Sequence, residues 1–275
     1  ISLGFTNSDD FEFLELTNIG TTNADLTLLT LSGGIDFDFS TGTLTNLAPG
    51  TRVLLVKNLA AFEARYGNAL PIAGEFSGSL NNAGDTLILN DQVLNLTLQN
   101  FDYSDDLPWP LCADGDGYSL ILKNPTRNPD HGLASNWRCS SLPNGNPDAT
   151  DSQPDFTGTP LADNDHDGYS QLLEHFLGTS DTNPGDTTKP IQTGITQAAD
   201  LQTYPTLQVT YLIGADDVTP TAEWSNDLQT WSDLPADILL LNETQNPNGT
   251  ATLKWRSTQP ITEARQFLRL KVTSQ

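Results

Sequence analysis

The chain of 275 residues is poor in basic side chains. Lys and Arg number 12 against 35 Asp and Glu, which gives a formal net charge of −23. So few cations cannot form the basic patch that binds a phosphate backbone, and nucleic acid is therefore not an expected partner. Anionic membrane surfaces are disfavoured for the same reason. A divalent cation is the natural partner of so acidic a surface, which also suits a calcium-rich exterior.

Methionine and long apolar runs are also absent. Because no methionine occurs, even at position 1, we expect a mature fragment or a processed product. No apolar run reaches the roughly 18 residues of a membrane span, and no signal peptide is visible. We therefore expect no membrane insertion, and we expect any export signal or anchor to lie outside this sequence.

Catalytic motifs are missing as well. The three histidines, His131, His166 and His175, do not group at ligand spacing, and we expect all three to be exposed. There is no G-x-S-x-G, no P-loop and no H-E-x-x-H. The sequence therefore predicts a protein that is not an enzyme. Carboxylates are so abundant that a glycosidase-like pair stays open as an alternative.

Cysteine is limited to two residues, Cys112 and Cys139, which form no C-x-x-C motif. In an exported protein they would pair and close a loop of about 27 residues, adding a few kcal/mol of stability. Two buried thiols are the alternative.

The most specific pattern that is present runs from Asp163 to Glu174. It matches D-x-[DN]-x-[DN]-G-x5-E, the Ca²⁺ loop, at every specified position, with Gly168 allowing the sharp turn. A solvated acidic turn is the alternative interpretation. The predicted ligands are the carboxylates of Asp163, Asp165, Asp167 and Glu174 and the backbone carbonyl of Tyr169, with Gln171 acting through water.

The sequence around this loop indicates a structural ion site. Residues 170–177 have an apolar stripe that predicts a short helix, which Gly178 can end. Before the loop, Phe156–Pro160 cannot form a helix because it holds Gly and Pro. A loop with an exit helix alone resembles the calcium repeats of dockerins and thrombospondin type 3 more than a paired sensor.

Three other aspartates could supply ligands. Asp181 could add an oxygen to the same ion or lie in a solvated turn. Asp114 and Asp116 could bind a second cation, although they lack a closing Glu and favour a Gly/Asp turn.

Two β-rich regions flank the loop, so the sequence predicts a mainly β fold with two immunoglobulin-like β-sandwich domains, joined by the loop and its short helix. The predicted domains are residues 1–148, a linker at 149–195 that includes 163–174 and 170–177, and residues 196–275. Alternation or strand-forming composition predicts strands at Phe11–Leu16, Leu26–Leu31, Ile35–Phe39, Arg52–Val56, Thr86–Leu89, Val93–Leu98 and, in the last region, at Thr206–Leu212, Pro220–Trp224, Ile238–Leu241, Thr250–Arg256 and Gln266–Val272. The spacing of apolar residues in Asn58–Tyr66 predicts a helix.

Three tryptophans lie in the C-terminal region. We expect Trp224, Trp231 and Trp255 to lie in the core of the C-terminal domain, and a sugar-binding platform is the alternative.

An ordered set of short motifs resembles a known family. The motifs are Phe11–Asn18, Leu47–Gly50, Phe62 with Tyr66–Gly67, Gly78–Gly84, Pro108–Pro110, Ala113–Leu120 and Ala134–Arg138. Together they are similar to the lamin-tail domain of secreted bacterial proteins, over about residues 1–148. The resemblance implies an immunoglobulin-like sandwich and a non-enzymatic module attached to larger extracellular proteins. The C-terminal region looks like a small sandwich found at the end of such proteins.

The sequence therefore predicts a non-catalytic, calcium-binding extracellular or cell-surface module. It would serve in surface attachment or adhesion, in binding of a surface protein or glycan, or in assembly, within a larger secreted protein. A self-assembling filament or sheath subunit is the alternative, and a hydrolase with an unrecognised site is a third. In the first interpretation the calcium loop fixes how the two β-domains sit relative to each other.

Overall fold

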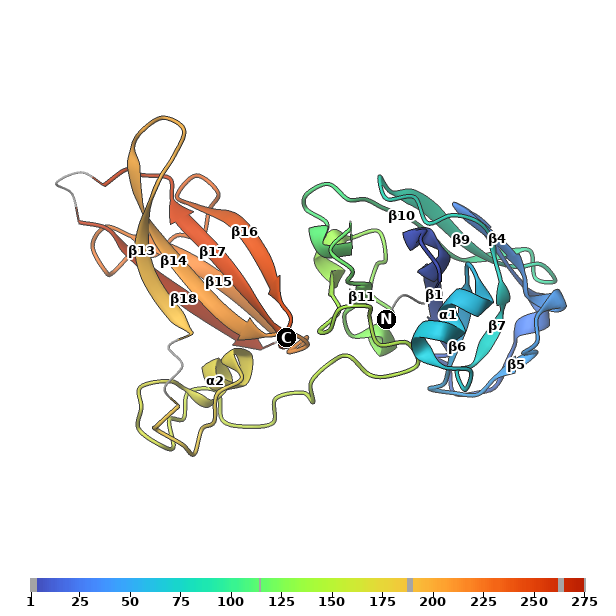
Figure 1. Cartoon of the computed structure of the whole chain (residues 1–275). Helices are drawn as coiled ribbons and strands as arrows, with labels where there is room; N and C mark the ends of the chain where they lie inside the picture. The colour runs from blue at the N-terminus through green and yellow to red at the C-terminus, as the bar shows by residue number, and fades with distance from the viewer. Residues whose placement is uncertain (1–3, 114, 187–189, 262–264, 275) are drawn as a thin grey trace. The chain divides into compact units, whose positions relative to one another are not determined.

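The computed structural model describes residues 4–113, 115–186, 190–261 and 265–274 (Figure 1). The chain is mainly β, of the β-sandwich type, as the sequence predicts. It divides into two compact units, Ile1–Asp151 and Ser152–Gln275, called here the N-terminal and the C-terminal unit. The stretch 152–195, which the sequence assigns to a linker, thus lies within the C-terminal unit.

Two sheets and two short ribbons form the N-terminal unit. The smaller sheet has the order β1-β6-β7, from Phe13–Thr17, Arg52–Val56 and Ile72–Glu75. The larger has the order β10-β9-β3-β4-β8, from Leu96–Tyr103, Asp85–Asp91, Leu29–Gly33, Ile35–Asp38 and Ser77–Gly78. The ribbons pair β2 with β5 and β11 with β12, from Ala24–Asp25, Asn46–Leu47, Leu120–Leu122 and Trp137–Cys139. A buried cluster takes side chains from both sheets: Leu31, Ile35, Val53, Leu55, Ala73 and Leu87.

The pair β6 and β7 is parallel, which the sequence reading does not anticipate. Helix α1, Leu59–Tyr66, connects the two strands. Asn58 caps its first turn by accepting a hydrogen bond from the N–H of Ala61, and Phe62 is buried. A helical crossover of this kind is what two parallel neighbours in a sheet require.

Several predicted strands have other bounds in the structure. The strand predicted at Val93–Leu98 begins only at Leu96, and two others are shortened by 3₁₀ turns. Leu26–Leu28 is a 3₁₀ turn, so that strand begins only at Leu29, and Phe39–Thr41 is a second 3₁₀ turn. In both cases an aspartate, Asp25 or Asp38, accepts a hydrogen bond from the N–H two residues on. This local capping competes with strand pairing, which explains why apolar spacing alone gave the wrong bounds.

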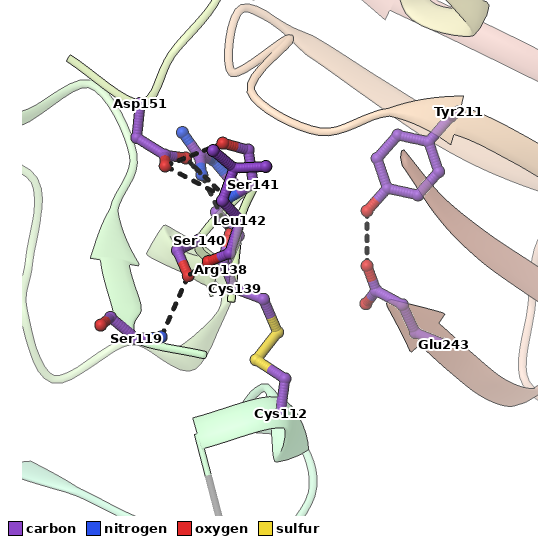
Figure 2. Close-up of a disulfide and its surroundings, with 10 residues drawn as sticks. All are labelled: Cys112, Ser119, Arg138, Cys139, Ser140, Ser141, Leu142, Asp151, Tyr211 and Glu243. Carbon is purple, nitrogen blue, oxygen red and sulfur yellow. Dashed lines mark hydrogen bonds and ion pairs between the residues drawn. A yellow bond between two sulfur atoms is a disulfide. The ribbon is translucent and has the colours of Figure 1, made fainter. Parts of the chain in front are cut away.

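The predicted disulfide is present between Cys112 and Cys139 (Figure 2). Beside it, Arg138 forms an ion pair of 2.5 Å with Asp151, the last residue of the unit. The same carboxylate accepts hydrogen bonds from the N–H and the hydroxyl of Ser141. The end of the N-terminal unit is thus fastened to the segment that carries the disulfide.

A four-stranded and a two-stranded sheet make up the β-sandwich of the C-terminal unit. The first has the order β13-β14-β17-β16, from Ile191–Gln197, Thr203–Leu212, Thr250–Ser257 and Ile238–Asn246, and the second pairs β15 with β18, from Val218–Ser225 and Phe267–Ser274. Helix α2, Gln171–Leu177, contacts β14 and β18 (Figure 1). Its Leu172, Phe176 and Leu177 belong to the same buried cluster as Leu207 and Leu253.

The three tryptophans differ in position. Trp255 is buried in the core, and Trp224 packs against the core and donates its indole N–H to Gln266. Trp231 is half-buried outside that cluster, with the Arg269 guanidinium 4.0 Å from its ring centre. The prediction that Trp231 lies in the core is therefore wrong. Its ring packs instead against the Arg269 guanidinium, in a cation–π contact.

Within the described ranges, no helix is long and apolar enough to cross a membrane.

We expect that replacing Cys112 and Cys139 together by serine lowers the free energy of unfolding of the N-terminal unit by about 3–4 kcal/mol, since the pair closes a long loop. Urea unfolding followed by hydrogen exchange resolves the two units. Protection of β14 in the C-terminal unit is the internal control and stays unchanged. Equal loss of protection in both units would contradict a role confined to the first.

Candidate metal centre

The predicted loop brings three carboxylates together. Ligand atoms of Asp163, Asp165 and Asp167 all lie within 4.8 Å of one another. In the described part of the chain, this is the one group of three or more His, Cys, Asp or Glu side chains so placed. No lysine or arginine occurs between residues 139 and 188 of the sequence to neutralise them.

Each of these aspartates also shapes the loop. Asp163 accepts a hydrogen bond from Gly168 N–H, Asp165 from Asp167 N–H, and Asp167 from Tyr169 N–H. Gly168 has φ +97°, which suits a residue without Cβ, so the chain turns back on the carboxylates there. One carboxylate oxygen of each aspartate thus accepts a backbone hydrogen bond, and the other oxygen can bind another partner.

Two of the remaining oxygens are buried. Oδ1 of Asp163 and Oδ2 of Asp165 are shielded from solvent and make no hydrogen bond with the described residues. A buried charged oxygen without a partner is costly. Such oxygens are satisfied when a cation lies between them.

Glu174, the last residue of the loop, is the most telling of the predicted ligands. It lies in α2 and is only 1% exposed, and neither of its carboxylate oxygens makes a hydrogen bond of ordinary geometry in the described residues. Burial raises the pKa of Glu174 to about 7, the nearby Thr179 hydroxyl opposes this, and the charges of Asp165, Asp167 and Asp181 add to it. A glutamate placed there as an anion calls for a cation in contact with it.

Gln171 does not serve the loop as the sequence suggests. Its side-chain oxygen accepts a hydrogen bond from Thr159 N–H at 2.7 Å, and its nitrogen donates to Asp181 Oδ2 at 2.5 Å. Both ends of the amide are therefore engaged away from an ion. The ninth loop position ties the incoming chain to the segment that follows α2.

Asp181 lies outside the loop and connects its first residues to its last ones. It accepts hydrogen bonds from the backbone N–H of Asn164 at 3.2 Å, from the Asn164 amide at 2.6 Å and from Gln171. Partial desolvation would raise the pKa of Asp181, but these donors outweigh it and lower the pKa. Sequence reasoning left the role of Asp181 open, and the structure makes it a brace of the loop.

The segment before the loop is fixed to the C-terminal unit. Gln153 N–H donates to Gly214, and Phe156 N–H donates to Asp217 at 2.6 Å. Asp217 also pairs with His175 of α2 at 3.0 Å. Asp217 was missed from the sequence because no spacing rule links it to a loop some forty residues earlier.

This His175–Asp217 pair is half of the arrangement that a nucleophilic hydrolase needs. In the described residues, no serine, threonine or cysteine side chain hydrogen-bonds His175. The prediction that all three histidines are exposed is wrong for His175 and His131, which are half-buried, and right for His166. His131 packs against Phe101 and Trp137, and burial lowers its pKa.

The acidic pair Asp114 and Asp116 does not form a comparable site in the described structure. Asp116 is exposed, and Asp114 lies outside the described residues.

The donors fit a hard cation. All predicted ligand atoms are oxygens, and three aspartates, one carbonyl and a bidentate Glu174 would supply six of them. Ca²⁺ accepts six to eight oxygens in an irregular shell, whereas Mg²⁺ requires a near-octahedral one and keeps several waters. The residues present therefore fit calcium.

Comparisons with known proteins found no match for this chain: no protein-family model, no curated protein and no solved structure is significantly similar to it.

We expect that Asp181→Ala weakens calcium binding about tenfold, the usual effect of removing a residue that orients the ligands. Isothermal titration calorimetry measures it. Asp155→Ala is the matched control, because it removes one exposed charge from the same segment. Equal weakening in both variants would reduce the role of Asp181 to net charge.

Proposed function

We propose that this chain is a non-catalytic calcium-binding module that works outside the cell, in surface attachment, ligand binding or assembly within a larger secreted protein. The proposal depends first on the metal. The observation that carries it is Glu174, a fully buried carboxylate with two unpaired oxygens beside the aspartate triad. A solvated acidic turn has no reason to bury its last carboxylate.

Two further features favour an extracellular setting. The Cys112–Cys139 disulfide is typical of proteins that fold in an oxidising compartment. A single loop without a partner loop belongs to the weaker class of calcium sites, which are filled where calcium is abundant. The ion would thus be a structural component of the module.

The attachment role rests on the N-terminal unit. Its motifs resemble the lamin-tail module, and its sandwich carries no candidate catalytic group in the described residues that we can assign. We propose that this unit meets the partner, a surface protein or glycan. The disulfide and the Arg138–Asp151 pair would keep it folded at the surface of a cell.

For the metal, we expect the metal-free protein to bind one Ca²⁺ with a dissociation constant on the order of 10⁻⁵ to 10⁻³ M, and Mg²⁺ more weakly. Calorimetry on the full chain tests this. Asp163→Asn keeps the acceptor for Gly168 but loses the buried anionic oxygen, so its heat should vanish, whereas Asp155→Asn should bind normally. Absence of heat with the native chain would refute the metal site.

Self-assembly is the second candidate function, and one observation favours it. Strand β16 is an edge strand, and its consecutive Leu239, Leu240 and Leu241 are 41%, 46% and 38% exposed. Glu243 is its one charged residue, whereas edge strands are commonly protected by lysine or proline. Such an edge can accept a strand from another chain.

If assembly uses this edge, the native chain should form larger particles as its concentration rises, and Leu240→Lys should abolish them, because a charge cannot be buried there cheaply. Sedimentation velocity measures the particle size. Leu228→Lys, at another exposed leucine of the same unit, is the control. A native chain that stays monomeric at high concentration would remove this candidate.

A further inference from the structure

Helix α2 is buried on nearly every side. Leu172 and Phe176 face the sheets, where Phe176 stacks on Tyr211 of β14 with ring centres 4.8 Å apart and planes 8° apart. Glu174 lies about 160–200° around the helix from these two residues, on the opposite side. It is nevertheless 1% exposed. One side of α2 is therefore covered by the β-sandwich, and the other by the acidic loop.

The two sides of α2 place opposite demands on folding. Burial of Leu172, Phe176 and Leu177 favours docking of the helix on β14 and β18. The same docking takes the Glu174 carboxylate out of water, next to the charges of Asp165 and Asp167. Without a cation, that carboxylate opposes the docking that its neighbours favour.

Several contacts link the docking of α2 to the conformation of the acidic loop. Gly178 ends it at φ +75°, and a Cβ there would lie 3.0 Å from Cβ of Leu212, so the helix end sits close against β14. His175 and Phe156 are both bound to Asp217. Gln171 joins the first turn of the helix to Thr159 and to the brace residue Asp181. Loop, helix and sheet therefore close together.

We infer that calcium in the loop Asp163–Glu174 controls the docking of α2, and through it the folding of the C-terminal unit alone. This inference rests on the proposed metal site and gives it a regulatory role. The ion is a folding ligand of one sandwich, so the C-terminal unit closes where calcium is available. The N-terminal unit, which has its own core and disulfide, folds without it.

The test is hydrogen exchange of the full chain, in calcium and in chelator, followed by mass spectrometry. We expect calcium to slow exchange at least about tenfold in peptides from α2 and from β14, which packs on it, because binding stabilises the state that holds the ion. Peptides from β6 in the N-terminal unit should not respond. Calcium-dependent protection in β6 of the same size would overturn the inference.

Glu174→Gln is the decisive variant, since it keeps the shape of the side chain but removes the buried charge. In chelator it should protect α2 and β14 better than the native chain, and calcium should add nothing. Asp165→Asn, a loop ligand outside the helix, should also lose the calcium response, but without comparable protection in chelator. Asp233→Asn, at an exposed residue of the same unit, should behave as the native chain.

Two failures are distinguishable. If calorimetry shows calcium binding but protection is confined to residues 163–170, the metal site stands and control of folding is refuted. If the native chain binds no calcium, the metal site itself is refuted, and the inference falls with it. A Glu174→Gln chain that is less protected than the native chain in chelator would also overturn the inference.

Discussion

The structure of the C-terminal unit depends on one electrostatic constraint, the burial of the Glu174 carboxylate. The residue lies in a helix that the core needs, between apolar neighbours that must leave water. The charges that act on it are those of the carboxylates of Asp165, Asp167 and Asp181, and no lysine or arginine occurs between residues 139 and 188 of the sequence. Coulomb repulsion in a poorly solvated place is costly, and the nearby Thr179 hydroxyl offsets only part of it. A cation would resolve the conflict, and the loop has the oxygens to hold one.

The same constraint makes the loop part of the C-terminal unit and not a joint between two units. From the sequence, a Pro/Gly-rich stretch between two β-regions suggests a joint that sets their relative placement. In the structure the stretch is fastened to the second sandwich by the backbone N–H groups of Gln153 and Phe156, and the first unit ends at the Arg138–Asp151 pair. Each unit thus has its own stabilising feature, a disulfide in one and a candidate ion site in the other.

Much of the fold follows from the sequence, because apolar alternation and turn residues are local signals. The strands at Arg52–Val56 and Thr250–Arg256, the helices ending at Gly67 and Gly178, and the disulfide all appear as expected. The aspartate triad follows too, since its residues are close in sequence.

The features that the sequence does not predict are of two kinds. In some, local capping competes with strand pairing, and in others the contacting residues are far apart in the sequence. Asp25 and Asp38 form caps that replace strand pairing by 3₁₀ turns, although the apolar spacing continues through them. The parallel partner of β6 lies across a helix, and β13 has polar, exposed residues that give no alternation. Asp217 and Asp181 act on the loop from outside it, through hydrogen bonds that only the folded chain creates.

The position of the ligands also argues against a catalytic ion. A catalytic metal keeps a coordination position open toward substrate, whereas here Glu174 and the remaining oxygens of Asp163 and Asp165 are buried. Six protein oxygens would leave an ion with little beyond one water. His175, which follows Glu174 in α2, is turned to Asp217. An ion bound in such an arrangement would stabilise the fold, and under the proposed function the surfaces of the folded units would recognise the partner.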